Sequence, residues 1–168
     1  MAIGSSALCG TFKREILAGI HRLTAHTRAS STISADTFKV AMFTNSASID
    51  ADTTGYTTSN EVSGTNYSAG GATLSSVTIG LADNSSAVPT AFVDFADTTF
   101  SSSTISSARG ALIYNSTLSS AGTGSTTNHA ADPAVAVINF GGDKSSSAGD
   151  FTIQYPANDA NNAIIRIS

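Results

Sequence analysis

Few side chains in this sequence could perform nucleophilic or metal chemistry, since the 168 residues include one Cys, three His and two Glu. A nucleophilic Cys9 would need a His and an activating electrostatic field beside it. Close to the start of a predicted helix, Cys9 is instead expected to be a small buried hydrophobe. His21 and His26 are five positions apart and lack a third ligand, so they are expected to be ordinary polar residues rather than a zinc pair.

Two pairs of carboxylates are the remaining catalytic candidates, Asp50 with Asp52 and Asp94 with Asp97. Glycoside hydrolysis needs two carboxyls beside a sugar cleft, and a chain with no Trp and four Tyr has little with which to line one. Calcium binding through Asp50, Asp52 and Thr54 matches an EF-hand loop only loosely, because the required Gly and bidentate Glu are missing. We therefore expect turn-capping aspartates, and no enzyme, metal or cofactor.

A glycine-rich segment and an isolated cation complete the candidates. Gly141–Ser145 lacks the spacing and the following helix of a phosphate-binding loop, so it predicts a hairpin turn before Phe151. Arg109 precedes an apolar run and is expected to form an ion pair with Asp94 or Asp97, with an intersubunit contact as the alternative.

The elements that must position these residues begin with one helix. Phe12, Ile16, Ile20 and Leu23 recur at spacings of four, four and three, which predicts an amphipathic helix over 11–23. Thr11 is the expected N-cap, and Gly19 is expected to weaken the helix interior. A short helix with one apolar face must lie on something larger.

Beyond a linker or loop at 24–36, the pattern changes to the two-residue alternation of β-strands. The expected fold is mainly β, an antiparallel β-sandwich or jelly-roll-like arrangement with one short N-terminal amphipathic helix. An N-terminal arm and helix would occupy 1–36, and the sandwich domain 37–168. The loop at 44–72 is long enough to be functional or to be ordered by a neighbouring subunit. The expected strands are 38–43, 77–81, 92–95, 111–114, 134–140, 151–155 and 164–167, with turn-rich pieces at 44–72, 82–90, 115–133 and 141–150.

Hydroxyl groups replace much of the usual surface charge. Charged residues make up 12% of the chain, against about 25% in typical globular domains, while Ser and Thr number 27 and 22. The net charge is −4, although five of the eight basic residues lie in the first 39 positions. A negative chain without a Lys/Arg stripe and interleaved aromatics is not expected to bind nucleic acid.

No run of roughly 20 apolar residues is present, so no membrane span is expected. The first ten residues also lack a basic region and a long apolar run, so we expect no secretory signal and synthesis in a cytoplasm.

A resemblance to a known family is carried by several blocks in a fixed order after the opening helix. The clearest are EVSGTNYSAGG at 61–71, ARGALIYN at 108–115 and FGGDKSSSAGDFTI at 140–153, together with TFKVAMFT at 37–44 and DFAD at 94–97. Over most of residues 11–167 the chain resembles a family of small virion structural proteins of tailed bacteriophages, many of them cyanophages.

The resemblance implies a decoration or cement protein on the outer surface of the phage head, made in the host cytoplasm and bound to the major capsid protein. A tail, neck or fibre component that contacts the host receptor is the alternative. We also expect a homotrimer with the 44–72 loop at its interface. The basic, amphipathic N-terminal segment is the expected docking element, through Phe12, Lys13, Arg14, Ile16, Ile20, Arg22 and Leu23.

Overall fold

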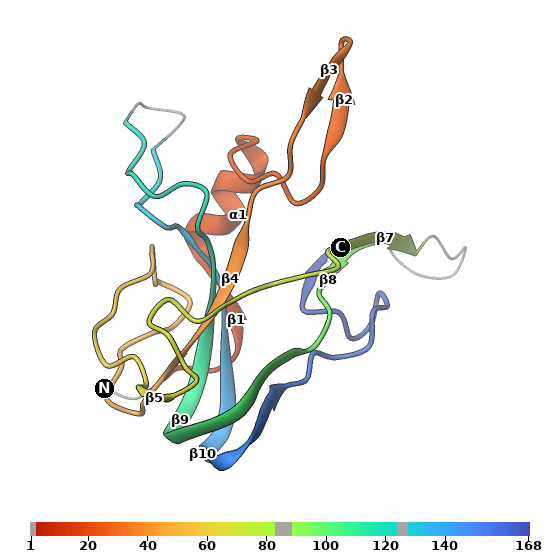
Figure 1. The fold of residues 1–168 in the computed structure, drawn as a ribbon. Helices are drawn as coiled ribbons and strands as arrows, with labels where there is room; N and C mark the ends of the chain where they lie inside the picture. The colour runs from red at the N-terminus through yellow and green to blue at the C-terminus, as the bar shows by residue number, and fades with distance from the viewer. Residues whose placement is uncertain (1–2, 83–88, 124–127) are drawn as a thin grey trace.

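The computed structural model describes residues 3–82, 89–123 and 128–168 (Figure 1). Strands and bridges make up 48% of the described residues and the one helix among them 5%, so the expected mainly β, antiparallel fold class is confirmed. The elements are β1 (Ala7–Leu8), α1 (Gly10–Leu17), β2 (His26–Arg28), β3 (Ser31–Ile33), β4 (Phe38–Phe43), β5 (Gly64–Thr65), β6 (Ala72–Thr73), β7 (Thr78–Ala82), β8 (Thr90–Asp94), β9 (Thr98–Asn115), β10 (Ala134–Ile153) and β11 (Ile165–Ile167). Parts of the turns expected at 82–90 and 115–133 lie outside the described residues.

The main sheet is built on a long antiparallel ribbon of β9 and β10. Its strand order is β1-β10-β9-β4-β6, and β5 pairs with β9 at Thr104 and Ile105. The apolar runs of β4, β9 and β10 meet in register, with Val40 opposite Ile113 and Ile113 opposite Ala136. Because these runs are continuous rather than alternating, both faces of the sheet are covered here, and Val40 and Ile113 are fully buried.

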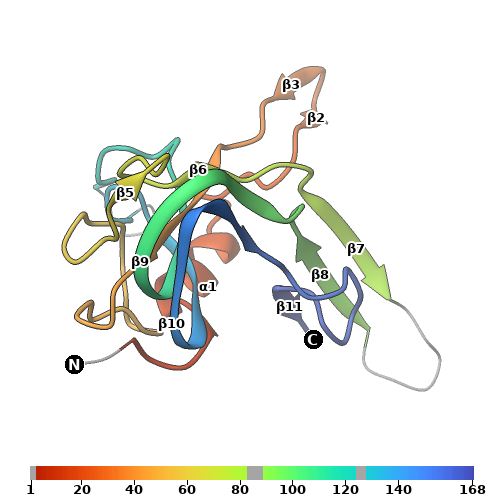
Figure 2. The same ribbon diagram turned by 60° about the horizontal axis from the view of Figure 1, so that its bottom comes forward.

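The predicted hairpin turn at Gly141–Ser145 is wrong. The runs at 134–140 and 151–155 were expected to be separate strands, but both contribute to β10, and the intervening segment continues to pair with β9. The register shifts between Asn139 and Lys144, and Gly141 has a φ of 72°. A bulge of this kind bends a strand without ending it, and the ribbon curves accordingly (Figure 2).

A second, three-stranded sheet with the order β11-β8-β7 stands beside the curved ribbon (Figure 2). Its strands match the runs expected at 77–81, 92–95 and 164–167 to within two residues. Val93 and Ile165 oppose each other and are buried, so this pair joins the sheet to the core.

The helix is shorter than predicted, because α1 ends at Leu17. Gly19, expected inside the helix, takes a φ of 70° just beyond its end. Gly19 N–H donates to the Ile16 carbonyl and Ile20 N–H to the Glu15 carbonyl, the bonds of a Schellman terminus. Cys9 rather than Thr11 is the N-cap residue. No helix in the described ranges is long and apolar enough to cross a membrane.

The segment before the β2–β3 hairpin, residues 3–23, is packed into the body of the molecule. Ala7 in β1 pairs with Val137 in β10, and the Cys9 N–H donates to the Val135 carbonyl. The segment 24–36, expected to be a linker or loop, contains the antiparallel hairpin of β2 and β3.

The 44–72 loop is ordered by its own chain, through a carboxylate that sequence reasoning did not single out. Glu61 accepts hydrogen bonds from the hydroxyls of Tyr56 at 2.6 Å and Tyr67 at 2.7 Å and from the Gly70 N–H at 2.8 Å. The Tyr56 ring stacks on Tyr114 of β9 with ring centroids 4.4 Å apart. This loop therefore needs no neighbouring subunit to hold it.

Candidate functional site

The β2–β3 hairpin stands away from the rest of the molecule (Figure 1). Residues 24–35, called the arm below, carry it. In the described part of the chain, β2 and β3 pair with each other and with no further strand. Among its side chains that the structure describes, only Ile33 is partly buried. An isolated two-stranded hairpin is marginally stable in water, so the arm gains little from its own contacts.

A two-residue turn closes the tip of the arm. Ala29 and Ser30 have φ values of 47° and 69°. Positive φ at both central residues is what a type I′ hairpin turn requires. Residues other than Gly, Asn and Asp rarely adopt this conformation, so the composition at 29–30 does not predict a hairpin turn.

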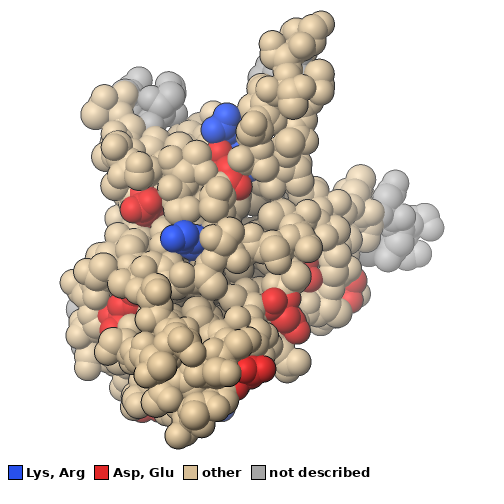
Figure 3. Space-filling view, viewed as in Figure 1, with Lys and Arg blue, Asp and Glu red and all other residues tan. Residues whose placement is uncertain are grey.

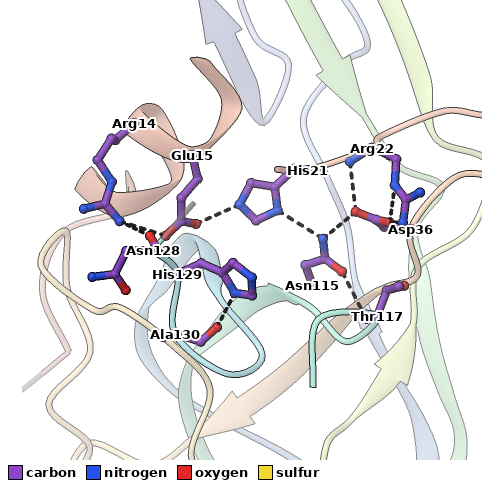
Figure 4. Close-up of polar contacts among 10 residues, drawn as sticks. All are labelled: Arg14, Glu15, His21, Arg22, Asp36, Asn115, Thr117, Asn128, His129 and Ala130. Carbon is purple, nitrogen blue, oxygen red and sulfur yellow. Dashed lines mark hydrogen bonds and ion pairs between the residues drawn. The ribbon is translucent and has the colours of Figure 1, made fainter. Parts of the chain in front are cut away.

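The base of the arm is clamped by the residues that flank it, Arg22 and Asp36 (Figure 4). The Asp36 carboxylate accepts hydrogen bonds from the Arg22 backbone N–H at 2.9 Å and from Nε at 3.0 Å, and the Arg22 guanidinium lies 2.8 Å from Asp36 Oδ1. In return, the Asp36 N–H donates to the Arg22 carbonyl at 2.7 Å. The two chain ends of the arm are therefore held side by side.

The clamp rests on a chain of buried polar groups. Asn115 Nδ2, on β9, donates to Asp36 Oδ2 at 2.8 Å and to His21 Nδ1 at 3.1 Å. His21 Nε2 lies 2.9 Å from Glu15 Oε2, on α1. The side chains of Glu15, His21 and Asp36 have no solvent-accessible surface. We call Glu15, His21, Arg22, Asp36 and Asn115 the anchor.

The hydrogen bonds of the anchor assign the proton on His21. Asn115 Nδ2 can only donate, so His21 Nδ1 is the acceptor, and the proton lies on Nε2, where it is donated to Glu15. Burial lowers the pKa of His21, while the hydrogen bond to Glu15 and the charges of Glu15 and Asp36 oppose that shift. His21 is therefore a neutral bridge between carboxylates.

A Glu–His pair can also be part of a catalytic relay, but here neither ring nitrogen of His21 is free to contact a substrate. Both ring nitrogens of His21 are occupied by Glu15 and Asn115, and the ring lies against Phe12 with centroids 4.9 Å apart. A general base needs a nitrogen that can reach a substrate proton. The anchor thus holds structure rather than performing proton transfer.

The predicted docking residues are split between the core and the surface. Phe12 is 1% and Leu23 7% exposed, both within the chain's own core. Ile16 packs partly buried against that core, and Arg22 belongs to the anchor. Ile20, Arg22 and Leu23 lie beyond the end of α1, because the Schellman terminus redirects the chain there. Of the seven predicted residues, only Lys13 and Arg14 remain exposed. Phe12 and Ile16 of the helix pack on the protein's own core.

Next to the anchor, Arg14 connects α1 with the 115–133 loop. The Arg14 guanidinium donates to the Asn128 carbonyl at 2.6 Å and lies 3.4 Å from Glu15 Oε1. Residues 124–127 of that loop lie outside the described part of the chain.

Other candidate residues serve local structure. Cys9 is fully buried, as expected, and burial raises its pKa to about 12. Asp50 Oδ1 accepts the Asp52 N–H at 2.9 Å and so closes a turn, as expected. Arg109 pairs with Asp143 at 2.7 Å rather than with Asp94 or Asp97, because the unbroken β10 runs beside it.

The second acid pair does not face a shared cleft. Asp97 Oδ1 accepts the Tyr155 N–H at 2.9 Å. Asp94 is 7% exposed, and its Oδ1 is buried without a hydrogen-bond partner. Within the described ranges, no three His, Cys, Asp or Glu side chains gather as a metal site would require.

An open groove of about 620 Å³ lies between β1, β10 and the C-terminal segment. Leu8, Tyr155, Pro156, Ile164 and Arg166 contribute to its walls. Among the described residues that line it, Arg166 is the one Lys, Arg, Asp or Glu, and no carboxylate side chain or His lies beside it there.

Sequence reasoning missed Glu15, Asp36 and Asn115 as members of one network. One signal was available: Glu is so rare in this chain that its two copies, Glu15 and Glu61, stand out. Both accept hydrogen bonds from nearby residues of the chain, Glu15 from His21 and Glu61 from Tyr67. Comparison with known proteins finds no family model, no curated protein and no solved structure that matches the chain.

Proposed function

We propose that the protein is a structural, non-enzymatic component of a phage particle, a decoration or cement protein on the outer surface of the capsid that docks through its arm. The single observation behind this proposal is an exposed hairpin held at its base by a buried, fully bonded anchor. Fixing an element before it binds lowers the entropy cost of association. The proposal moves the docking element from the helix to the arm that follows it.

The chemistry of the surface supports the same function. Charged side chains are few and scattered on the face shown in Figure 3, and the exposed arm residues include Thr27, Ser31 and Thr32. Hydroxyl groups lose less on desolvation than charges do, which suits a contact repeated over a lattice. The expected homotrimer and its major capsid protein partner stay predictions.

The first test is the copy number of the protein relative to the major capsid protein in purified particles, measured by quantitative mass spectrometry. A ratio near one-to-one supports a cement protein. A ratio of a few per hundred, or absence from the particle, would overturn that function, and a low ratio would favour the tail or receptor-binding alternative.

The second test addresses the arm. Thr27 and Thr32 oppose each other across the hairpin, and both are exposed. Replacing both by Asp sets like charges opposite each other and changes the arm without touching the anchor. We expect binding to particles stripped of the protein to fall at least about tenfold, or about 1.4 kcal/mol.

The matched control is the double replacement of Thr99 and Thr152 by Asp, an exposed cross-strand pair in the β9–β10 ribbon. Thermal melting establishes that each variant is folded before binding is compared. Equal loss of binding in both variants would contradict a docking role for the arm.

A further inference from the structure

A second surface is incomplete in the single chain, the outer edge of the three-stranded sheet. β7 is the edge strand in the order β11-β8-β7, and it pairs with β8 alone among the strands described. Half of the backbone N–H and C=O groups of an edge strand point away from its neighbour. Within the described ranges, the outward-facing backbone groups of Thr78–Ala82 form no hydrogen bond to a segment other than β8.

Apolar side chains gather on one face of this edge. Leu81, Ala91 and Ile167 oppose one another across β7, β8 and β11, so their side chains share a face, and Ile79 lies two residues from Leu81 on the same face. Ile79, Leu81 and Ile167 are 50%, 67% and 52% exposed. These are three of the four large apolar side chains that are exposed in the described part of the chain.

The edge also lacks the devices that normally prevent pairing. Exposed edge strands commonly carry charged residues, Pro or bulges. Thr78–Ala82 contains no charged residue and no Pro, and its register with β8 is unbroken over all five positions. Gly80 brings no side chain to the edge. The Phe92 ring of the neighbouring strand fills the space that a Cβ at this position would need.

We propose that β7 pairs with β7 of a second copy of this chain, antiparallel and about a two-fold axis at Gly80. In that register Ile79 lies opposite Leu81 of the second copy and Leu81 opposite its Ile79, so both apolar pairs fall on one face. The two three-stranded sheets become one six-stranded sheet with a continuous apolar strip.

The lack of charge and the symmetry of the strand favour a second copy of this chain as the partner of β7. A neutral edge offers nothing to a charged partner, which would lose its own hydration on contact, whereas a second copy presents the same uncharged, apolar strand. The symmetric order Ile79-Gly80-Leu81 makes the strand complementary to itself under a two-fold operation.

The contact is small. Five residues span about 17 Å at about 3.4 Å each, and pairing over so short a strand does not bury the about 1,200–2,000 Å² of a standard interface. Association is therefore weak between free molecules and becomes strong only where copies are held close together.

The test is sedimentation equilibrium of the full chain over about a hundredfold range of concentration, compared with Leu81→Lys. The inference does not depend on the proposed function, because no particle is needed. We expect the average mass of the wild type to rise with concentration toward twice that of its smallest species, and Leu81→Lys to weaken association at least about tenfold.

Leu17→Lys is the matched control, since Leu17 is 90% exposed at the end of α1 and lies away from the edge. It should associate like the wild type. Leu81→Thr retains β-propensity and tests the same contact if Leu81→Lys is unstable. A wild-type mass that stays constant, a threefold rise, or equal association of the wild type and both Leu81 variants would each overturn the proposal.

Discussion

At the scale of single residues, several carboxylates hold loops and turns in place. Glu61 binds two tyrosines and an amide, and Asp50 closes a turn. Asp94 is the exception, since Oδ1 is buried without a partner. Burial raises the pKa of Asp94, the backbone N–H of Phe95 opposes the shift, and the charge of Asp97 adds to it.

We predict that Asp94→Asn stabilises the protein at pH 7. A raised carboxyl pKa means that the folded state holds the proton more tightly, so ionisation costs stability as the pH rises through that pKa. Removing the charge should raise the free energy of unfolding by about 1 kcal/mol, measured by urea denaturation, with little difference from the wild type at pH 3. Asp52→Asn, which removes an exposed carboxylate elsewhere, is the control, and a less stable Asp94→Asn at pH 7 would refute the argument.

At the scale of elements, the C-terminal end of α1 and the bend of β10 each contain a glycine with positive φ. Gly19 lets the chain leave the helix toward Arg22, and Gly141 lies at the bulge of the ribbon. The direction taken after Gly19 decides where the arm begins.

We predict that Gly19→Ala destabilises the protein by about 1 kcal/mol, because its φ of 70° disfavours a side chain even though nothing lies within 4 Å of an added Cβ. For a chain of this size the melting temperature should fall by about 2–4 °C. Gly142→Ala serves as control, since it also has free space but no positive φ. An equal effect at both positions would show that the helix terminus contributes nothing particular.

At the scale of the whole molecule, the anchor joins three segments that are far apart in the sequence. It connects α1 through Glu15, the base of the arm through Asp36 and the central ribbon through Asn115. His21 is the titratable bridge between them, and it faces Glu15 and Asp36 as well as the more distant His129.

We predict that acidification below the ordinary His pKa of about 6.5 lowers the stability of the whole protein. Burial lowers the pKa of His21 in the folded state, so the unfolded chain binds the proton more tightly. The stability present above about pH 6.5 is therefore lost as the pH falls toward the folded pKa, by at most about 1.4 kcal/mol per pH unit.

Urea denaturation at several pH values measures this loss. His21→Gln keeps a donor for Glu15 but does not titrate, so its stability should depend less on pH over the same range. His26→Gln, in the exposed arm, is the control and should behave like the wild type. Identical pH dependence in all three proteins would exclude His21 as the cause.

The sequence by itself determined the local periodicity and therefore the fold class. Alternation and apolar runs located β4, β7, β8 and β11 to within two residues, because burial on a strand is a local pattern. The burial of Cys9 and the turn at Asp50 were also predictable, because each depends on the residue type and its near neighbours in the sequence.

Only the tertiary structure decided which segments meet. Gly141–Ser145 has the composition of a turn, but pairing with β9 keeps it in one strand. Asn115 lies 79 positions from Asp36 and 94 from His21, so no local pattern could reveal their contact. The anchor and the arm it holds exist because hydrogen bonds between distant residues outweigh local propensity once the surrounding core has excluded water.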